Sequence, residues 1–391
     1  MPGYELIGKE ERQAVLDIFD KYGGVLFRHG FESLRNNSFK VREFQAAFAK
    51  KMGSRYAQAV TSGSAALKVA LQALGVTPGD EVVTQCFTFV ATVEAILECG
   101  AIPVITEIDE TLNIDPDDFK RKITPKTKAV VPVHMFGAPA DMDAIMRIAK
   151  TAGLKVLEDA AQAAGGKYKN KSLGAIADAG AFSFDFGKAL TTGEGGMICT
   201  ADREIFQRCM ELADHGHENN PARPRGEDTR RRGGFNYRMT ELQGALGLAQ
   251  LGKLDYIIEQ QRKNKAMLIK GIKGIGGLKF RVFAEGAQEA ADTLTFTLGS
   301  AGKARDFSAK MKQEGLATKN LPDAFSWHFA GTWGHLLSGL AEYRGRDLMR
   351  QWPKSCDYLM RTIAMPINVN MPEGRINEII ASLAKIAAEV L

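Results

Sequence analysis

One lysine of this 391-residue chain stands inside an apolar, glycine-rich stretch. In AFSFDFGKALTTGEGGMIC, residues 181–199, Lys188 follows Phe184 and Phe186 and precedes a glycine-rich turn. Partial removal from water lowers the pKa of an amine and lets it form a Schiff base with an aldehyde. The alternative is a surface lysine that follows a strand, and the lysine alone leaves that alternative open.

An aspartate at the end of another apolar run changes the balance. Asp159 follows KVLE in LEDAAQAAGG. Pyridoxal phosphate needs a carboxylate beside its pyridine nitrogen, which keeps that nitrogen protonated and the ring able to accept electrons. Asp is also a good helix N-cap, so the aspartate alone is weak evidence. Together, Lys188 and Asp159 form a coherent pair at strand ends and predict this cofactor.

Two further stretches suit the same cofactor. In TSGSAALK, Gly63 and Ser64 open a helix whose free N–H groups and positive dipole end would hold a phosphate, and Ser183 could add a hydroxyl. The alternative is a capped helix without a ligand. Phe89 in CFTFVAT is a candidate for stacking on a planar ring, although periodicity alone favours a core aromatic.

Two polar stretches are candidates for binding a metal ion or an anionic substrate. DHGHE contains two histidines only two positions apart with no defined ligand set, so we expect no metal site. PARPRGEDTRRRGG is usually a solvated loop, but arginine forks also suit an anionic substrate. Its candidate substrate-binding residues are Arg223, Arg225, Arg230, Arg231 and Arg232.

The elements around these residues predict an α/β fold. Short apolar segments (EVVTQ, AIPVITEID, KAVVPVH, LKVLEDA, AGAFSFD and GGMICT) alternate with helical ones, which favours a mixed, mostly parallel sheet with helices on both faces. Ligands of such sheets bind beyond the carboxyl ends of the strands, so Asp159 and Asp185 should share one crevice. We expect a large domain over residues 1–250 and a small α+β domain over 251–391, with one long helix from LGKLDYIIEQQRKNKAMLIKGI between them.

Composition excludes several classes of protein. Net charge is only +5, because 46 acidic residues offset 51 basic ones, and no nucleic-acid partner is expected. The five cysteines are odd in number and widely spaced, which is typical of reduced thiols in the cytoplasm. No apolar run has the length of a signal peptide core or a membrane span, so no membrane insertion is expected.

Five motifs in order resemble one family. TSGSAALK, FTFVAT, LEDAAQAAGG, FSFDFGKALTTGEGG and GGFNYRMTELQGALGLAQL follow the order and rough spacing of the sugar aminotransferases of the DegT/DnrJ/EryC1/StrS family. The resemblance is strong over about residues 1–270 and weak to the C-terminus. It implies a fold-type-I pyridoxal phosphate enzyme, a homodimer with shared active sites, and amino transfer from glutamate to a keto-sugar.

The resemblance also implies residue roles. Lys188 would carry the cofactor, Asp159 would meet the pyridine nitrogen, Phe89 would stack on the ring and Gln162 would lie beside the ring oxygen. The phosphate would be held by Gly63, Ser64, Ala65, Ser183 and the neighbouring subunit's counterpart of Asn236. The chain departs from the family pattern at Asp185-Phe186-Gly187, where a histidine or aromatic followed by proline is usual, and at Ala189, where asparagine is usual.

Within the family, the likeness points to a particular acceptor. MPGYELIGKEE, SFD, DHGHE and LGLAQLGKLDYIIEQQRKNK are similar to members that aminate 8-oxo-3,8-dideoxy-manno-octulosonate, a free sugar acid. Asp185 would hydrogen-bond sugar hydroxyls and repel a nearby phosphate. The alternative acceptor is a nucleotide-linked 4- or 3-keto-6-deoxy sugar. A sugar dehydratase is disfavoured because those relatives carry histidine in place of Lys188, and the retained Lys188 argues against a catalytically silent sugar-binding regulator.

Overall fold

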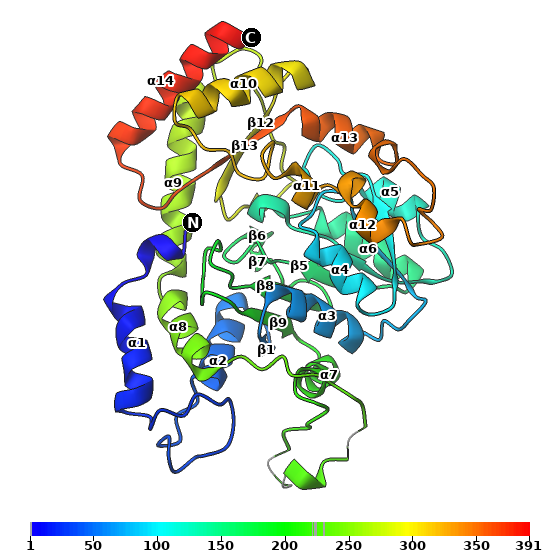
Figure 1. The fold of residues 1–391 in the computed structure, drawn as a ribbon, viewed down its shortest axis with the longest axis vertical. Coiled ribbons are helices and arrows are strands. Elements are labelled where there is room, and N and C mark those ends of the chain that lie inside the picture. The colour runs from blue at the N-terminus through cyan, green and yellow to red at the C-terminus, as the bar shows by residue number, and fades with distance from the viewer. Residues whose placement is uncertain (1, 221, 223–224, 230) are drawn as a thin grey trace.

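A seven-stranded sheet lies at the centre of the computed structural model, which describes residues 2–220, 222, 225–229 and 231–391 (Figure 1). Its order is β1-β9-β8-β5-β4-β2-β3. The strands are β1 (Tyr56–Val60), β2 (Glu81–Gln85), β3 (Ile102–Thr106), β4 (Thr127–Val131), β5 (Lys155–Asp159), β8 (Ala179–Ser183) and β9 (Gly196–Thr200). From β3 to β8 neighbouring strands are parallel, whereas β9 is antiparallel to both β8 and β1. The predicted α/β fold with a mixed, mostly parallel sheet is therefore confirmed.

Both faces of this sheet are buried, as its uninterrupted apolar strands predict. Successive residues of β4 belong to different cores: Val130 packs with Phe48, and Val131 packs with Leu71. The helices that accompany the strands of this sheet along the chain are α2 (Lys40–Met52), α3 (Gly63–Ala73), α4 (Ala91–Leu97), α5 (Pro116–Arg121), α6 (Met142–Ala152) and α7 (Arg203–Ala213). With both faces covered by helices, the carboxyl edge of the sheet is the place left for a ligand.

Three helices link the N-terminus to the second half of the chain: α1 (Lys9–Asp20), α8 (Glu241–Leu251) and α9 (Leu254–Ile272). The helix predicted over 251–272 begins at Leu254, because Gly252 and Lys253 turn the chain between α8 and α9. The Lys253 ammonium donates to the Leu6 carbonyl at 2.7 Å and to the Glu11 carboxylate at 2.8 Å. These contacts with the N-terminal segment stabilise the turn.

A small antiparallel sheet forms a separate core near the C-terminus. It consists of β10 (Lys279–Phe280), β12 (Thr293–Thr297) and β13 (Thr362–Pro366), covered by α10 (Ala301–Gln313) and α14 (Glu373–Val390). We call this sheet with its helices the small unit. The segment between α10 and β13 packs elsewhere, because Trp333 and Trp352 share a hydrophobic core with Phe87 and Phe136 beside the large sheet. The domain division at residues 250 and 251 stays a prediction.

The remaining elements are short. They are α11 (Phe325–His328), α12 (Gly334–Leu337), α13 (Pro353–Met360), β6 (Lys167–Tyr168), β7 (Lys171–Ser172), β11 (Ala287–Gln288), and the 3-10 turns η1 (Tyr4–Leu6), η2 (Met135–Gly137), η3 (Arg225–Glu227), η4 (Ala330–Thr332) and η5 (Leu348–Arg350). No helix within the described residues has the length and apolar character needed to cross a membrane.

Candidate active site

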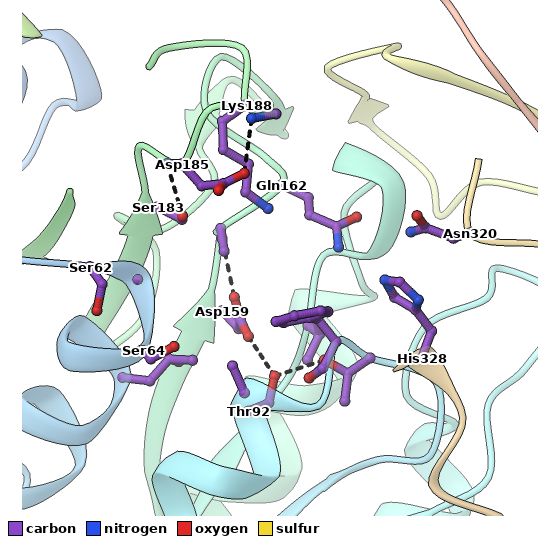
Figure 2. A pocket seen from close by; sticks show the side chains of 18 of the residues that line it. Ser62, Ser64, Thr92, Asp159, Gln162, Ser183, Asp185, Lys188, Asn320 and His328 are labelled. Carbon is purple, nitrogen blue, oxygen red and sulfur yellow. Dashed lines mark hydrogen bonds between the residues drawn. The ribbon is translucent and has the colours of Figure 1, made fainter. Parts of the chain in front are cut away.

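The structure gathers most of the predicted site residues around one cavity of about 390 Å³ (Figure 2). The cavity lies beyond the carboxyl ends of β5 and β8, as the topology requires. The predicted residues that line it are Gly63, Ser64, Phe89, Asp159, Gln162, Ser183, Asp185 and Lys188. They come from segments more than a hundred residues apart in sequence.

A tight turn after β8 presents Lys188 to the cavity. The Lys188 amide donates to the Asp185 carbonyl at 3.0 Å, and the Asp185 carboxylate accepts from the Gly187 amide at 2.9 Å. The Thr192 amide donates back to the Phe184 carbonyl at 2.9 Å and fixes the start of the turn. Burial lowers the pKa of the Lys188 ammonium, with the Asp185 carboxylate opposing that shift. The turn therefore holds an amine that loses its proton more readily than a surface lysine does.

Asp159, the last residue of β5, is 4% exposed. Its carboxylate accepts from the Thr92 hydroxyl at 2.8 Å and from the Ala161 amide at 3.1 Å. The Thr92 hydroxyl also lies 2.7 Å from that of Thr88 (Figure 2). Burial raises the pKa of Asp159, while both hydrogen bonds favour its charged form. A cation placed opposite this carboxylate would favour the charged form further.

The neighbouring carboxylate, Glu158, points to the other face of β5 because strand side chains alternate. It accepts from the amides of Gly174, Ile176 and Ala177 at 2.7 to 2.8 Å. The His134 Nε2–H group donates to it at 3.0 Å, since His134 Nδ1 accepts from the Ala140 amide. Glu158 thus ties the loop before β8 to the strand that carries Asp159.

The start of α3 forms one wall of the cavity. Ser62 is the N-cap, and its hydroxyl accepts from the Ala65 amide at 3.1 Å. A Cβ atom on Gly63 would lie 2.7 Å from the Ser183 Cβ, so only glycine lets this helix end approach β8 so closely. Serine hydroxyls and helix N–H groups converge here, which is the donor set that a phosphate requires. Ala65 lies outside the cavity lining and gives its amide to Ser62, so its phosphate role stays a prediction.

Phe89 and Gln162 face the cavity from another side. The Phe89 side chain is 42% exposed, and its ring lies nearly parallel to that of Trp327 with centroids 6.1 Å apart. The alternative of a core aromatic therefore does not hold for Phe89. The Gln162 side-chain carbonyl accepts from the Phe136 amide at 3.0 Å, which leaves its NH₂ group as the donor toward the cavity.

Several lining residues were missed by the sequence analysis: Thr92, Asp292, Lys319, Asn320 and His328. Most of them come from the second half of the chain, where the family resemblance is weak. Lys319 pairs with the Asp292 carboxylate at 2.5 Å. The polar stretch TKNLPDAFSWH was the available signal, but no periodicity in it indicated a cavity.

His328 is held in one tautomer. Its Nδ1–H group donates to the Ala324 carbonyl at 2.8 Å, so Nε2 carries the lone pair. Burial lowers the pKa of His328 to about 4, and the Lys188 and Lys319 ammonium groups act in the same direction. The imidazole is therefore a neutral hydrogen-bond acceptor at the cavity wall.

The remaining predicted residues that the structure describes do not line this cavity. Asn236 is exposed on the segment after α7, where it forms a β-bridge with Asp214. Arg231 is exposed, and the Arg232 guanidinium donates to the Glu211 carboxylate at 2.6 Å. Arg225 begins η3, and Arg223 and Arg230 lie outside the described residues.

The acidic and histidine side chains of the DHGHE segment pair with neighbouring side chains. Asp214 pairs with His29 at 3.0 Å and with Arg238, and His217 pairs with Asp228. Within the described residues, no group of three histidine, cysteine or acidic side chains is arranged to hold a metal ion.

The fold and the cavity together define a pyridoxal phosphate enzyme of fold type I. The chain belongs to the DegT/DnrJ/EryC1/StrS aminotransferase family, whose family model matches residues 32–384. The cofactor and the enzyme class predicted from the sequence are confirmed.

Individual relatives agree with this assignment. The chain is 34% identical to the spore coat polysaccharide biosynthesis protein SpsC of Bacillus subtilis (strain 168), over 97% of this chain and 95% of that protein. It is 40% identical to the GDP-perosamine synthase of Escherichia coli O157:H7, over 60% of this chain and 64% of the synthase. Among solved structures, 3-amino-5-hydroxybenzoic acid (AHBA) synthase superposes with a TM-score of 0.84 at 26% identity, covering 97% of this chain and 96% of the synthase.

Proposed function

We propose that this sugar aminotransferase moves an amino group from glutamate to a free keto-sugar acid, 8-oxo-3,8-dideoxy-manno-octulosonate. Such a product would serve cell-surface polysaccharide or lipopolysaccharide synthesis in the cytoplasm. The observation that carries the amino-transfer chemistry is the meeting of Lys188 and Asp159 in one cavity. Asp159 ends β5 and Lys188 follows β8, so the two residues are distant in the sequence and the parallel pairing of these strands brings them together.

Lys188 has two tasks in this proposal. When bound, pyridoxal phosphate supplies an aldehyde that takes up the amino group and a ring that withdraws electrons. The Lys188 amine would hold the aldehyde group of the bound cofactor and, when free, would accept the proton from the donor Cα. The lowered pKa of Lys188 supports both tasks, because each needs the neutral amine.

Asp159 would keep the ring nitrogen of the cofactor protonated. Its two hydrogen-bond donors, Thr92 and Ala161, fix the carboxylate and leave lone pairs for the ring N–H group. The exposed Phe89 face would hold the ring plane, and the Gln162 NH₂ group would meet the ring oxygen. At the start of α3, Ser64 and the backbone of Gly63 would receive the phosphate together with Ser183.

Asp185 supports the acceptor assignment. It stands immediately before the Lys188 turn and lines the cavity, so its carboxylate would accept hydrogen bonds from sugar hydroxyls near the reacting carbon. A diphosphate brought to the same place would be repelled. The described arginines of residues 223–232 do not line the cavity of their own chain, so this stretch would hold the far end of the sugar acid only from a neighbouring subunit.

The relatives support a second acceptor, a nucleotide-linked 4- or 3-keto-6-deoxy sugar, because GDP-perosamine synthases match this chain at 40% identity. Single-turnover reaction of the aminated enzyme with each keto-sugar separates the two. We expect rapid consumption of the octulosonate and little of UDP- or GDP-linked sugars. Efficient turnover of a nucleotide-linked sugar, with none of the octulosonate, would overturn the acceptor and leave the aminotransferase intact.

A homodimer with shared active sites is part of the proposal. Within the described residues, large exposed apolar side chains gather in the N-terminal segment: Tyr4, Ile7, Leu16, Phe19, Leu26, Phe27, Phe31 and Leu34. Such a concentration is typical of a protein interface. The loop before α2 and the loop after α7 project from the same end of the molecule (Figure 1), and His29 joins them through Asp214. In a homodimer formed through this end, Asn236 of one subunit would lie near the active-site cavity of the other.

A catalytically silent regulator would not need the Lys188 amine or the Asp159 carboxylate. Purified protein reconstituted with pyridoxal phosphate should show a visible absorbance band that borohydride removes, and glutamate should change it. A protein that binds sugar but shows neither response would be the silent binder.

A further inference from the structure

The active-site cavity contains a second ammonium group, which the cofactor chemistry does not use. Lys319 belongs to the segment that leads from α10 of the small unit back to the large sheet. Its amide donates to the Ala364 carbonyl of β13 at 2.8 Å, and its carbonyl accepts from the Leu321 amide at 2.8 Å. The small sheet thus fixes the backbone from which this lysine enters the cavity.

Lys319 is more enclosed than an ordinary surface ion pair. Its side chain is 26% exposed and that of Asp292 is 11% exposed, with 2.5 Å between the charged atoms. By comparison, Lys312 and Asp323 pair at the same distance with 57% and 40% exposure. Removing charges from water costs free energy, which offsets the attraction between the two charges. A gain in folding stability is therefore a weak reason for an ion pair at the wall of a cavity.

The Lys319 ammonium has N–H groups to spare. Within the described residues, Asp292 is its recorded acceptor, and the other Asp292 oxygen accepts from the Thr293 hydroxyl at 2.7 Å. An ammonium offers three donors, so two remain for a ligand. The next residue, Asn320, also lines the cavity and adds a side-chain NH₂ group.

These donors lie away from the phosphate site. In Figure 2, Ser62 and Ser64 stand on one side of the cavity, Asn320 and His328 stand on the other, and Lys188 and Asp159 lie between them. The Asn320 side chain therefore lies across the cavity from the serines at the start of α3, and Lys319 precedes it in the chain. An anion held by these two residues would belong to a substrate.

We propose that Lys319 and Asn320 form a carboxylate-binding subsite that holds a substrate opposite the phosphate end of the cavity. Asp292 positions the ammonium, and the carboxylate accepts from Lys319 Nζ and from the Asn320 amide. This inference rests on the proposed function, in which both substrates carry carboxylates. The ligand is therefore either the amino donor or the sugar acid.

Separate half-reactions test the subsite. The holoenzyme is mixed with glutamate, with glutamine and with isoglutamine, while half-saturation is followed through the cofactor absorbance. The aminated enzyme is then mixed with the octulosonate and with a neutral keto-sugar. Lys319→Met and Lys319→Gln should raise half-saturation about tenfold or more for the substrate whose carboxylate is bound, because a charge-assisted hydrogen bond is lost. Lys319→Arg should recover part of the loss.

The comparison of substrates identifies the carboxylate. A donor carboxylate is indicated if Lys319→Met erases the difference between glutamate and one of its two amides, and a sugar carboxylate if only the octulosonate weakens. Lys312→Met, which removes the exposed lysine of the same unit, should stay within twofold of the unchanged enzyme.

Retention of the borohydride-sensitive band shows that a Lys319 variant keeps its cofactor site. Changes below twofold for every carboxylate, in both the Met and Gln variants, would overturn the subsite. Failure of the unchanged enzyme to react with glutamate or any keto-sugar would instead overturn the proposed function.

Discussion

The two walls of the active-site cavity are built in different ways. The first wall is the carboxyl edge of the large sheet, where hydrogen bonds fix Asp159 at the end of β5 and the turn after β8 that carries Lys188. The second wall is an irregular segment from the second half of the chain, which carries Lys319, Asn320 and His328. The first wall suits chemistry that must not vary, and the second suits substrate selection, because irregular segments change without disturbing a sheet.

Lys188→Ala tests the first wall most severely. Turnover should fall by at least about four orders of magnitude, because no other group can replace a covalent anchor and proton carrier. The borohydride-sensitive absorbance should vanish as well. Because Lys319 lies in the same cavity, the control is the double variant Lys188→Ala/Lys319→Met, which should remove any residual band. Unchanged absorbance and turnover in Lys188→Ala would show that this lysine has the wrong role.

Asp159→Asn should bind the cofactor and catalyse poorly. An amide cannot hold the ring nitrogen protonated, and the loss should amount to about 3 to 4 kcal/mol in activation free energy, or roughly 10²- to 10³-fold in the single-turnover rate. Thr92→Val, which removes only a hydrogen bond to the carboxylate, should cost less. Near-normal rates in Asp159→Asn would refute its assignment to the ring nitrogen.

The lowered pKa of His328 provides a test of the second wall. Its folded pKa of about 4 lies below the unfolded value of 6.5, so the unfolded chain binds the proton more readily and stability is lost as pH falls between these values. At pH 5 the cost is about 2 kcal/mol in the free energy of unfolding. Urea titrations at pH 7 and pH 5 should show this difference in the unchanged protein and not in His328→Asn. Equal pH dependence in both proteins would mean that folding does not lower the pKa of His328.

Mixing of variant subunits tests whether a neighbouring chain contributes Asn236 to the active-site cavity. If Asn236 serves the neighbouring cavity, inactive Lys188→Ala and inactive Asn236→Ala chains should complement each other, since one hybrid site carries neither lesion. Random exchange should restore about a quarter of the sites in a dimer. The check is activity after mixing, with exchange proven by mass-labelled chains. No recovery despite exchange would assign Asn236 to its own subunit.

The first wall could be read from the sequence, and the second could not. Asp159 ends an apolar strand and Lys188 follows another within a short turn, and parallel topology alone brings such strand ends to one edge. Lys319 reaches the cavity through the pairing of residue 319 with β13, a contact between distant segments that leaves no local periodicity. The strand β1 was also missed, because its buried Gln58 interrupts the apolar run. Gln58 donates to the Ala59 carbonyl, a local bond that composition does not reveal.

The adjacent carboxylates of β5 have a consequence for inherited changes in this chain. Glu158 and Asp159 face opposite sides of one strand, and each accepts hydrogen bonds from a different set of partners. Inserting or deleting one residue in the turn before β5, where it slips the strand by one position in the sheet, would turn each carboxylate to the opposite face. The loop before β8 would then lose its anchor at the same moment that the cavity lost its carboxylate. Length variation among descendants of this protein should therefore accumulate in the segments around Lys319 and be absent from the approach to β5.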